Sequence, residues 1–331
     1  MNITPVSAAD ISIVVQGAVS KETTPECLCS LRDVFPGAEI ILSTWEGTDA
    51  AGLEFDKLVL SKDPGAQTGD ESANIPNNVN RQIVSTKAGV ALEERRYILK
   101  TRTDIRFYGS SFLSYFGKYD EVPPYLFKNR LIICDFYTRD PRASKVCFHP
   151  SDWLTFGNAD DVKKYYLGLE LQTVEDAEWF KHHKKQEKIY VTFLSRYTPE
   201  QHIFLSFLRR YRDIPFDYHC QYSREQQELS EKLMASCFTV LDYQKQLEIE
   251  FTKYFPNRVR ERNTLLRHRR WKATYERYCL NVRSWGWRRY LIAAGTNEKL
   301  IALRALCARI LSFLHLKEPL KRFFGLFGYG K

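Results

Sequence analysis

The sequence predicts an α/β protein in which helices flank a largely parallel sheet. Within the first 107 residues, strand-like apolar runs alternate with helix-like segments, which is typical of a nucleotide-binding α/β sheet. The run "ISIVVQGAV" (11–19) is continuously apolar until Gln16-Gly17, the pattern of a strand buried on both faces. Hydrophobic residues make up 44% of the 331, enough for a large core and too many for a disordered chain.

The first half supplies most of this sheet. A helix begins at Thr24-Pro25-Glu26, where a cap residue, a first-turn proline and an acid suit a helix N-terminus, and it stops at Pro36-Gly37. A second helix is expected despite its glycine, and it leads into the strand "ILKTRTDIRF". The remaining predicted elements of this half are strands 38–45 and 55–61, helix 78–94 and strand 98–107.

The second half is less regular. Strands are expected within 125–140 and from 145 to a polar turn, followed by a helix that starts at Asp160-Asp161. An exposed helix is expected over 175–188. Residues 198–211 form an amphipathic helix in which Thr198 is the cap and Gln201 completes a capping box.

Charge divides the chain near residue 251. From there onward 19 Lys/Arg face 4 Asp/Glu, whereas the first 250 residues carry 30 against 36. We therefore expect a main domain over 1–250 and a basic, aromatic-rich helical segment over 251–331, whose partner is a polyanion. In that segment, leucines from Leu300 to Leu314 share one face of an amphipathic helix.

Targeting signals and metal-type cysteine spacings are lacking. The eight cysteines include no CxxC pair, so reduced core cysteines are expected. The start "MNITPVSAAD" has no secretory signal, and no run reaches about 18 uninterrupted apolar residues. These features predict a cytoplasmic protein, with attachment to a membrane surface left open.

Polar residues follow several predicted strands, where α/β sheets bind ligands. They are Gln16-Gly17, Trp45-Glu46, Asp63 and Arg102–Asp104. Neither GxGxxG nor GxxxxGK[ST] follows the first strand, so a dinucleotide fingerprint and a P-loop are both excluded.

Six blocks follow one another in order along the chain, namely "DISIVVQGAV", "FPGAEIILSTWEG", "FDKLVLSKDPG", "NNVNRQIVSTKAGV", "ILKTRTDIRF" and "HPSDWLTFGNADDV". Together they resemble the WavE lipopolysaccharide synthesis family, and the resemblance covers about residues 10–215. It implies a GT-A-like fold, which is a mixed sheet that binds a nucleotide-sugar at its strand ends. It also implies glycosyl transfer to lipopolysaccharide core or a related bacterial surface glycan, with a glycolipid or oligosaccharide as the acceptor.

The resemblance places Arg102-Thr103-Asp104 where GT-A enzymes usually carry Asp-x-Asp, the motif that binds a divalent metal on the donor diphosphate. Arg102 replaces the first acid. One reading keeps Mg²⁺ or Mn²⁺ on Asp104, with waters and phosphate oxygens completing its shell. The other gives the positive charge to Arg102 or Arg106 as a clamp on phosphate. A third reading, an ordinary ion pair of Asp104 on an exposed strand, stays open.

Other candidates for donor binding follow from position. Gln16 and Gly17 let the backbone approach the base or ribose, or form an ordinary turn. Asp63 binds the base, or belongs to the turn signature "KDPG". Arg81 opens a helix, where anions are already favoured, and so suits phosphate or ribose.

An inverting transfer needs a base for the acceptor hydroxyl. Asp152 in "HPSDW" and Glu200 in "TPEQ" are the candidate catalytic carboxylates. Asp152 is expected on a polar turn beside an aromatic residue, which suits the face of a sugar. Glu200 has the alternative role of an acid that complements a helix dipole.

The basic segment has two alternative partners. Its interleaved aromatic and cationic residues fit an anchor on an anionic membrane surface, and we expect it to attach the protein to the inner face of the cytoplasmic membrane. The rival is a nucleic-acid-binding protein, disfavoured because no recognisable nucleic-acid motif is present. A sugar nucleotidyltransferase ranks third, since "QGAVSKETT" is poor in glycine.

Overall fold

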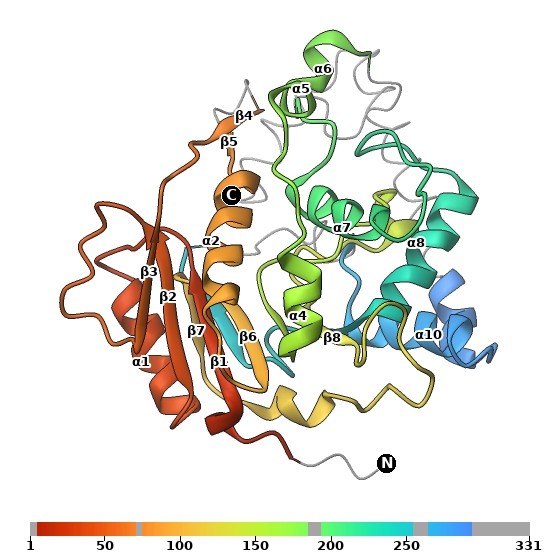
Figure 1. The fold of residues 1–331 in the computed structure, drawn as a ribbon. Coiled ribbons are helices and arrows are strands. Elements are labelled where there is room, and N and C mark those ends of the chain that lie inside the picture. The colour runs from red at the N-terminus through yellow and green to blue at the C-terminus, as the bar shows by residue number, and fades with distance from the viewer. Residues whose placement is uncertain (1–4, 71–74, 185–192, 254–263, 293–331) are drawn as a thin grey trace, which may run out of the picture.

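A seven-stranded sheet forms the centre of the protein in the computed structural model, which describes residues 5–70, 75–184, 193–253 and 264–292 (Figure 1). The strand order is β10-β8-β9-β6-β1-β2-β3. Only β9 in this sheet runs antiparallel to its neighbours. The strands are β1 (Ile11–Gln16), β2 (Glu39–Trp45), β3 (Lys57–Ser61), β6 (Tyr97–Arg102), β8 (Leu131–Cys134), β9 (Thr155–Asn158) and β10 (Phe238–Leu241).

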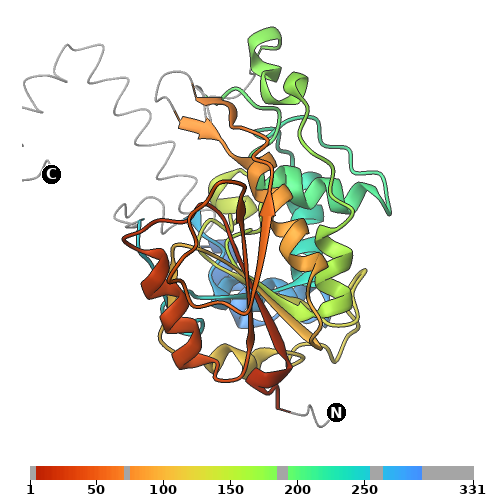
Figure 2. The same ribbon diagram turned by 60° about the vertical axis from the view of Figure 1, so that its left-hand side comes forward.

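Helices cover both faces of the sheet, so the predicted α/β class with a GT-A-like mixed sheet is confirmed. Figure 2 shows α1 (Thr24–Val34) and α2 (Val79–Ala91) on opposite sides of the strands. Successive side chains of a strand point to opposite faces. Accordingly Val14 belongs to the core under α2, whereas Ile13 and Val15 belong to the core under α1.

The glycine within the predicted helix 78–94 has a packing role. A Cβ atom on Gly89 would lie 2.4 Å from Val14 Cγ1 and 3.1 Å from Ser43 Cβ. The absent side chain therefore lets α2 approach β1 and β2 closely, and this close approach offsets the low helix propensity of glycine.

The second half adds helices to the face that carries α2. Four of them contribute to the core on that face, namely α4 (Ala159–Tyr166), α7 (Pro199–Arg209), α8 (Arg224–Cys237) and α10 (His268–Tyr278). The other three are the short helices α3 (Pro141–Ser144), α5 (Val174–Ala177) and α6 (Trp179–His182). The capping box predicted for α7 is confirmed, because Thr198 accepts from the Gln201 backbone and Gln201 reaches back to the Thr198 backbone. The helix predicted over 175–188 is wrong as one element. Two four-residue helices meet there at Glu178, and 185–192 lies outside the described residues.

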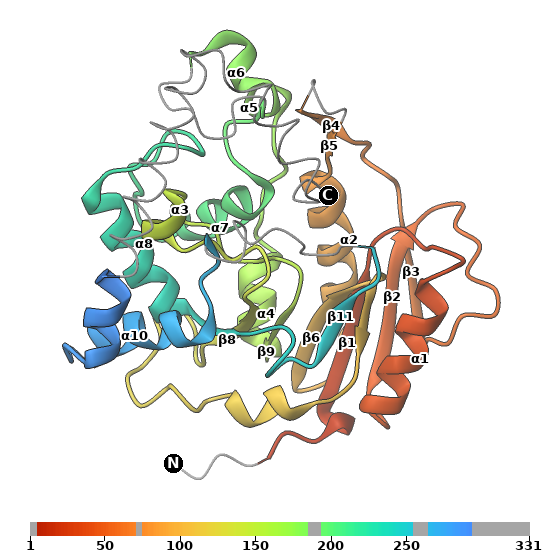
Figure 3. The same cartoon turned by 180° about the vertical axis from the view of Figure 1, so that it is seen from behind.

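Two small sheets lie beside the main one (Figure 3). β4 (Gln67–Asp70) pairs with β5 (Ile75–Asn77), and β7 (Ile105–Phe107) pairs antiparallel with β11 (Ile249–Phe251). The predicted strand 98–107 is thus two strands, β6 and β7, separated by Thr103 and Asp104. The second pairing matters for the site because it brings a segment about 150 residues distant in the chain next to Asp104.

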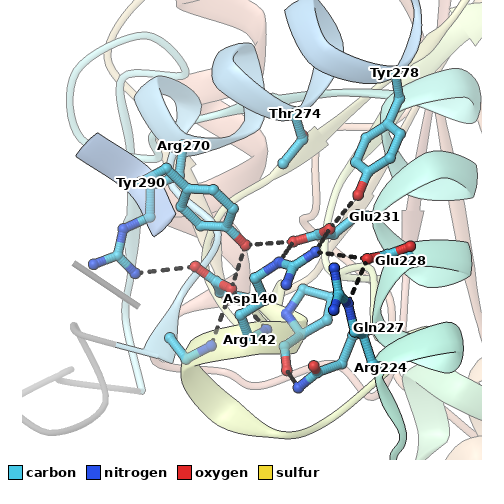
Figure 4. A network of polar contacts seen from close by, with 12 residues as sticks. Asp140, Arg142, Arg224, Gln227, Glu228, Glu231, Arg270, Thr274, Tyr278 and Tyr290 are labelled. Atoms are coloured by element: carbon cyan, nitrogen blue, oxygen red, sulfur yellow. Dashed lines mark hydrogen bonds and ion pairs between the residues drawn. The ribbon is translucent and has the colours of Figure 1, made fainter. Parts of the chain in front are cut away.

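A buried polar network joins α10 and the residues after it to α3 and α8 (Figure 4). The Tyr290 hydroxyl lies 2.9 Å from Asp140 Oδ1 and 2.7 Å from Glu231 Oε1. Arg142 donates to both Glu231 oxygens at 2.6 and 2.8 Å, and Tyr278 donates to Glu231 at 2.7 Å. Residues 264–292 are therefore attached to the main body, although the division of the chain at 251 stays a prediction. The amphipathic helix predicted around Leu300–Leu314 lies outside the described residues.

Candidate functional site

A cleft of about 380 Å³ opens at the carboxyl ends of β1, β2, β3 and β6. Gln16 and Arg102 are neighbours in the register of β1 and β6, so the polar ends of these strands meet at one edge. This is the edge at which α/β sheets bind ligands. The cleft is lined by Gln16, Gly17, Ala18, Trp45, Asp63, Asn78, Arg81, Gln82, Arg102, Thr103, Asp104 and Lys253.

The backbone after β1 requires glycine. Gly17 has φ +125°, a conformation that L side chains rarely adopt, and an added Cβ would lie 3.3 Å from Thr103 Oγ1. The Gly17 N–H donates to the Ser43 carbonyl at 3.0 Å, and Ser85 donates to the Gln16 side chain at 2.7 Å. Gln16 and Gly17 therefore form a rigid cleft wall that a ligand can approach at the level of the main chain.

Asp63 and Arg81 form an ion pair at the N-terminus of α2. Arg81 donates to both carboxylate oxygens, at 2.8 and 2.7 Å, and to Asn78 Oδ1 at 3.0 Å. The hydrogen bonds from Arg81 lower the pKa of the Asp63 carboxyl. The pair fixes the Arg81 guanidinium beside the positive end of a helix, where an anion is favoured.

Arg102 and Asp104 form a second fork. Arg102 Nε and Nη2 donate to the two Asp104 oxygens at 2.9 and 2.8 Å, and the guanidinium lies 4.0 Å above the centre of the Trp153 ring. Asp104 is only 4% exposed. Burial alone would raise the pKa of its carboxyl, but the hydrogen bonds and charge of Arg102, with the charge of Lys253, lower it below the ordinary value. Asp104 is therefore ionised at neutral pH and balanced by cations.

This arrangement does not fit a metal held by protein ligands. Both Asp104 oxygens are engaged by Arg102, and the described ranges contain no group of three or more His, Cys, Asp or Glu side chains able to hold an ion. Asp63, the other carboxylate on the cleft, is engaged by Arg81. The metal on Asp104 stays a prediction, and it requires Arg102 to release the carboxylate first.

Lys253 is a cleft residue that the sequence reasoning missed. Thr252 donates to the Asp104 carbonyl through its N–H at 3.1 Å and its hydroxyl at 3.2 Å, which holds Lys253 at the cleft. The alternating "IEF" of β11 was the available signal, but its partner strand could not be read from the sequence.

Arg106 does not line the cleft: it pairs with Glu26 at 3.2 Å and lies over the Tyr108 ring.

The two candidate catalytic carboxylates lie together behind the cleft, not on its lining. Asp152 and Glu200 are 4% and 9% exposed, so the "HPSDW" turn is buried rather than open. Gln82, which lines the cleft, has its side-chain nitrogen 3.5 Å from the Asp152 carbonyl oxygen. Asp152 therefore lies one residue layer from the cleft, next to the Trp153 ring that supports Arg102.

The electrostatics of this buried group raise the proton affinity of its carboxyls. Burial raises the pKa of both Asp152 and Glu200, and the negative charge of Glu200 raises that of Asp152 further. Among the residues that the structure describes, none makes a hydrogen bond to the Asp152 Oδ2 atom. Buried Lys100 donates to the Asp152 carbonyl oxygen, and burial lowers the pKa of its amine. A buried carboxyl with a free oxygen and a raised pKa is the type of group that accepts a proton near neutral pH.

His149 lies against Glu200, with Nε2 and Oε2 3.4 Å apart. Burial, and then the charge of Arg139, lower the pKa of His149 to about 3. The imidazole is neutral at physiological pH, so His149 contributes hydrogen bonding, not charge, to the group.

The fold and cleft define a class: a GT-A-like α/β protein whose cleft at the carboxyl edge of the sheet carries paired arginines and acids. A family model described as WavE lipopolysaccharide synthesis matches residues 11–298. The chain belongs to this family, which confirms the resemblance found in the sequence and supports a role in lipopolysaccharide synthesis. A search of curated proteins gave no match.

Proposed function

We propose that the protein is a glycosyltransferase that moves a sugar from a nucleotide-sugar donor to lipopolysaccharide core or a related surface glycan. One observation carries this proposal. Six residues predicted to bind the donor line a single cleft at the carboxyl edge of the sheet, namely Gln16, Gly17, Asp63, Arg81, Arg102 and Asp104.

In this proposal the donor diphosphate lies against Arg102, Arg81 and Lys253. Guanidinium groups match phosphate oxygens with two parallel hydrogen bonds, and a helix N-terminus adds to the attraction at Arg81. The nucleoside lies along Gly17, where the missing side chain permits close contact. As the glycosidic bond to the diphosphate breaks, the charge that develops on the departing phosphate is stabilised by these cations.

Asp152 is the base that we assign to an inverting transfer. It takes the proton of the acceptor hydroxyl while the oxygen of that hydroxyl bonds to the anomeric carbon of the donor. Because Asp152 lies behind Gln82, this role requires the Gln82 side chain to move aside when the acceptor binds. Glu200 and Lys100 tune the proton affinity of Asp152 from below the cleft. The acceptor, a glycolipid or oligosaccharide, approaches past Gln82.

Donor binding and transfer are tested separately. Calorimetry with UDP, GDP and ADP on the full chain identifies the nucleotide, and release of that diphosphate from its sugar donor reports turnover. Arg102→Gln is expected to weaken binding about tenfold or more, as loss of a charge-assisted pair requires. Arg224→Gln is the matched control, because the Arg224 side chain is 81% exposed and is not among the residues that line the cleft.

Asp152→Asn separates chemistry from binding. The variant keeps the shape of the side chain and is expected to bind the diphosphate as the wild type does, while turnover falls about 10²–10⁴-fold. Unchanged turnover would remove Asp152 from the base role.

EDTA tests the metal prediction, because a reaction supported by arginines alone continues in its presence.

We also propose that the basic segment attaches the protein to an anionic membrane surface at the inner face of the cytoplasmic membrane. In the part that the structure describes, Trp285 is 67% exposed and lies beside the exposed residues Arg283 and Arg288. An exposed indole among arginines suits the headgroup region of a bilayer. In the part of the chain that the structure describes, every helix is too short or too polar to span a bilayer.

Vesicle flotation tests the attachment. The full chain is expected to float with vesicles containing phosphatidylglycerol and not with neutral vesicles. Trp285→Ser should weaken this binding. Trp179→Ser is a control, because Trp179 stacks on His183 and lies outside the basic segment. Binding to RNA but not to either vesicle would favour the nucleic-acid alternative instead.

A further inference from the structure

A second cavity, of about 400 Å³, lies between the loop after α4 and the helix α7. These elements lie on the face of the sheet that carries α2 (Figure 1). We call it the arginine cavity, and no residue within the described ranges lines both this cavity and the cleft. It is lined by Gly168, Glu170, Asp176, Arg196, Tyr197, His202, Leu205, Ser206, Arg209 and Arg210.

Its arginines are held in place by the protein. Arg209 Nη2 donates to the Tyr197 hydroxyl at 3.1 Å and to the Phe216 carbonyl at 2.5 Å. Arg210 Nη1 donates to the Lys164 carbonyl at 3.1 Å. Within the described residues, the hydrogen bonds of these two side chains use only one terminal nitrogen each, so their other nitrogens are left to bind a ligand.

Arg210 also depends on a glycine. A Cβ atom on Gly168 would lie 2.2 Å from the guanidinium carbon of Arg210. The guanidinium therefore occupies the space that a side chain at 168 would fill, and this contact keeps it at the rim of the cavity.

A third cation, Arg196, comes from the segment that precedes α7. Arg196 lies over the Trp179 ring at 4.3 Å, donates to the Asp217 carbonyl at 2.7 Å and pairs with Asp176 at 3.3 Å. Fixed guanidinium planes lose little entropy on binding and present parallel N–H groups that match phosphate and carboxylate.

The same cavity offers acceptors. Asp176 and Glu170 carry carboxylates, and Ser206 contributes a hydroxyl. His202 is neutral, because burial lowers its pKa, and its ring contacts the Glu170 carbonyl through Nε2 at 3.0 Å. Among the described residues that line the cavity, three arginines against two acids leave a net charge of +1. A ligand suited to this set has an anionic group for the arginines and hydroxyls for the carboxylates.

We propose that the arginine cavity binds a sugar unit that carries a phosphate or carboxylate group. Its volume of about 400 Å³ falls within the range of small-ligand sites, roughly 300–1,000 Å³. The polar lining, with Tyr197 as its aromatic wall, suits a sugar better than an apolar ligand. The site is separate from the proposed transfer site and stands whether or not that proposal holds.

The experiment measures binding of glucose 6-phosphate, glucuronate, glucose and inorganic phosphate to the full-length protein by calorimetry. The better fitting of the two anionic sugars is expected to bind about tenfold more tightly than glucose and than inorganic phosphate. Glucose lacks the anionic group that the arginines bind, and inorganic phosphate lacks the sugar hydroxyls that the carboxylates bind. The tighter of the two identifies the anionic group. Equal affinity for glucose, or for phosphate alone, would overturn the proposal.

Variants then locate the binding. Arg210→Gln is expected to weaken the anionic sugar about tenfold. Ser206→Phe, which fills the cavity from α7, is a second route to the same loss, and thermal melts check that both variants fold. Arg212→Gln is the matched control, because Arg212 is exposed, lies two residues on and does not line the cavity. Arg81→Gln, in the cleft, should leave this binding unchanged. If Arg81→Gln abolishes it and the cavity variants do not, the ligand is bound in the cleft and the inference fails.

Discussion

Glu231 gives the sharpest stability prediction. Its side chain is fully buried, and it accepts two hydrogen bonds from Arg142 and one each from the hydroxyls of Tyr278 and Tyr290. Glu231→Gln keeps the shape but turns an N–H₂ group toward these donors. Arg142, whose side chain is 17% exposed, is left with Glu228 at 3.9 Å as a distant counter-ion.

Removing one partner of a buried ion pair costs about 3–5 kcal/mol. Because Arg142 keeps some solvent contact and a second acid, we expect the lower end, about 3 kcal/mol. For a chain of 331 residues, an unfolding entropy of roughly 2.1 cal/mol/K per residue gives about 0.7 kcal/mol/K. The melting temperature of Glu231→Gln should therefore fall by about 4 °C.

Urea unfolding followed by circular dichroism measures the change in the free energy of unfolding, and a thermal melt measures the fall in melting temperature. Glu228→Gln is the matched control. Glu228 is 44% exposed, and loss of its ion pairs should cost at most about 1 kcal/mol. Equal effects from both variants, or less than about 1 kcal/mol for Glu231→Gln, would refute the view that the network fixes residues 264–292 to the body.

Three further predictions concern the cleft. Gly17→Ala should cost about 1–2 kcal/mol in urea unfolding and weaken diphosphate binding, since Gly17 combines φ +125° with a close Thr103 contact; wild-type behaviour would exclude a role for this turn. Burial raises the pKa of Asp152 above its unfolded value, so wild-type stability falls as the pH rises through the interval between the two pKa values. Asp152→Asn lacks this loss, and its melting temperature relative to wild type should increase from pH 4 to pH 7, whereas a constant difference would show that the pKa of Asp152 is not raised. Lys253→Gln should weaken diphosphate binding and make it less sensitive to salt, and an unchanged salt dependence measured by calorimetry would place Lys253 away from the phosphates.

The sequence was most informative where local signals and burial agree. Strands β1 and β2 were predictable because each is a buried apolar run bounded by turn residues, and the Thr198 capping box marked the start of α7. Strand β3 was predictable from its apolar residues, although Leu58 and Leu60 are exposed. The polar residues after these strands pointed to the cleft, since parallel strands bring their carboxyl ends to one edge.

Long-range pairing set the limit of prediction. The contact between β7 and β11 joins residues near 106 and 250, and no local pattern encodes that partnership. As a result Lys253 was missed. Arg106 was expected at the cleft, but it forms an ion pair with Glu26 instead. The "HPSDW" turn was expected to be open because it is polar, yet tertiary packing buries Asp152.

The β7–β11 pairing also has a consequence for synthesis of the chain. Most of the cleft is encoded in the first 104 residues, but Lys253 and the Thr252 contacts to Asp104 are supplied by residues that follow β11. Domains generally form from the N-terminus onward during translation. The cleft wall at Asp104 therefore cannot be complete until residue 253 has left the ribosome, so a nascent or truncated chain can have most of its sheet and still lack a finished binding site.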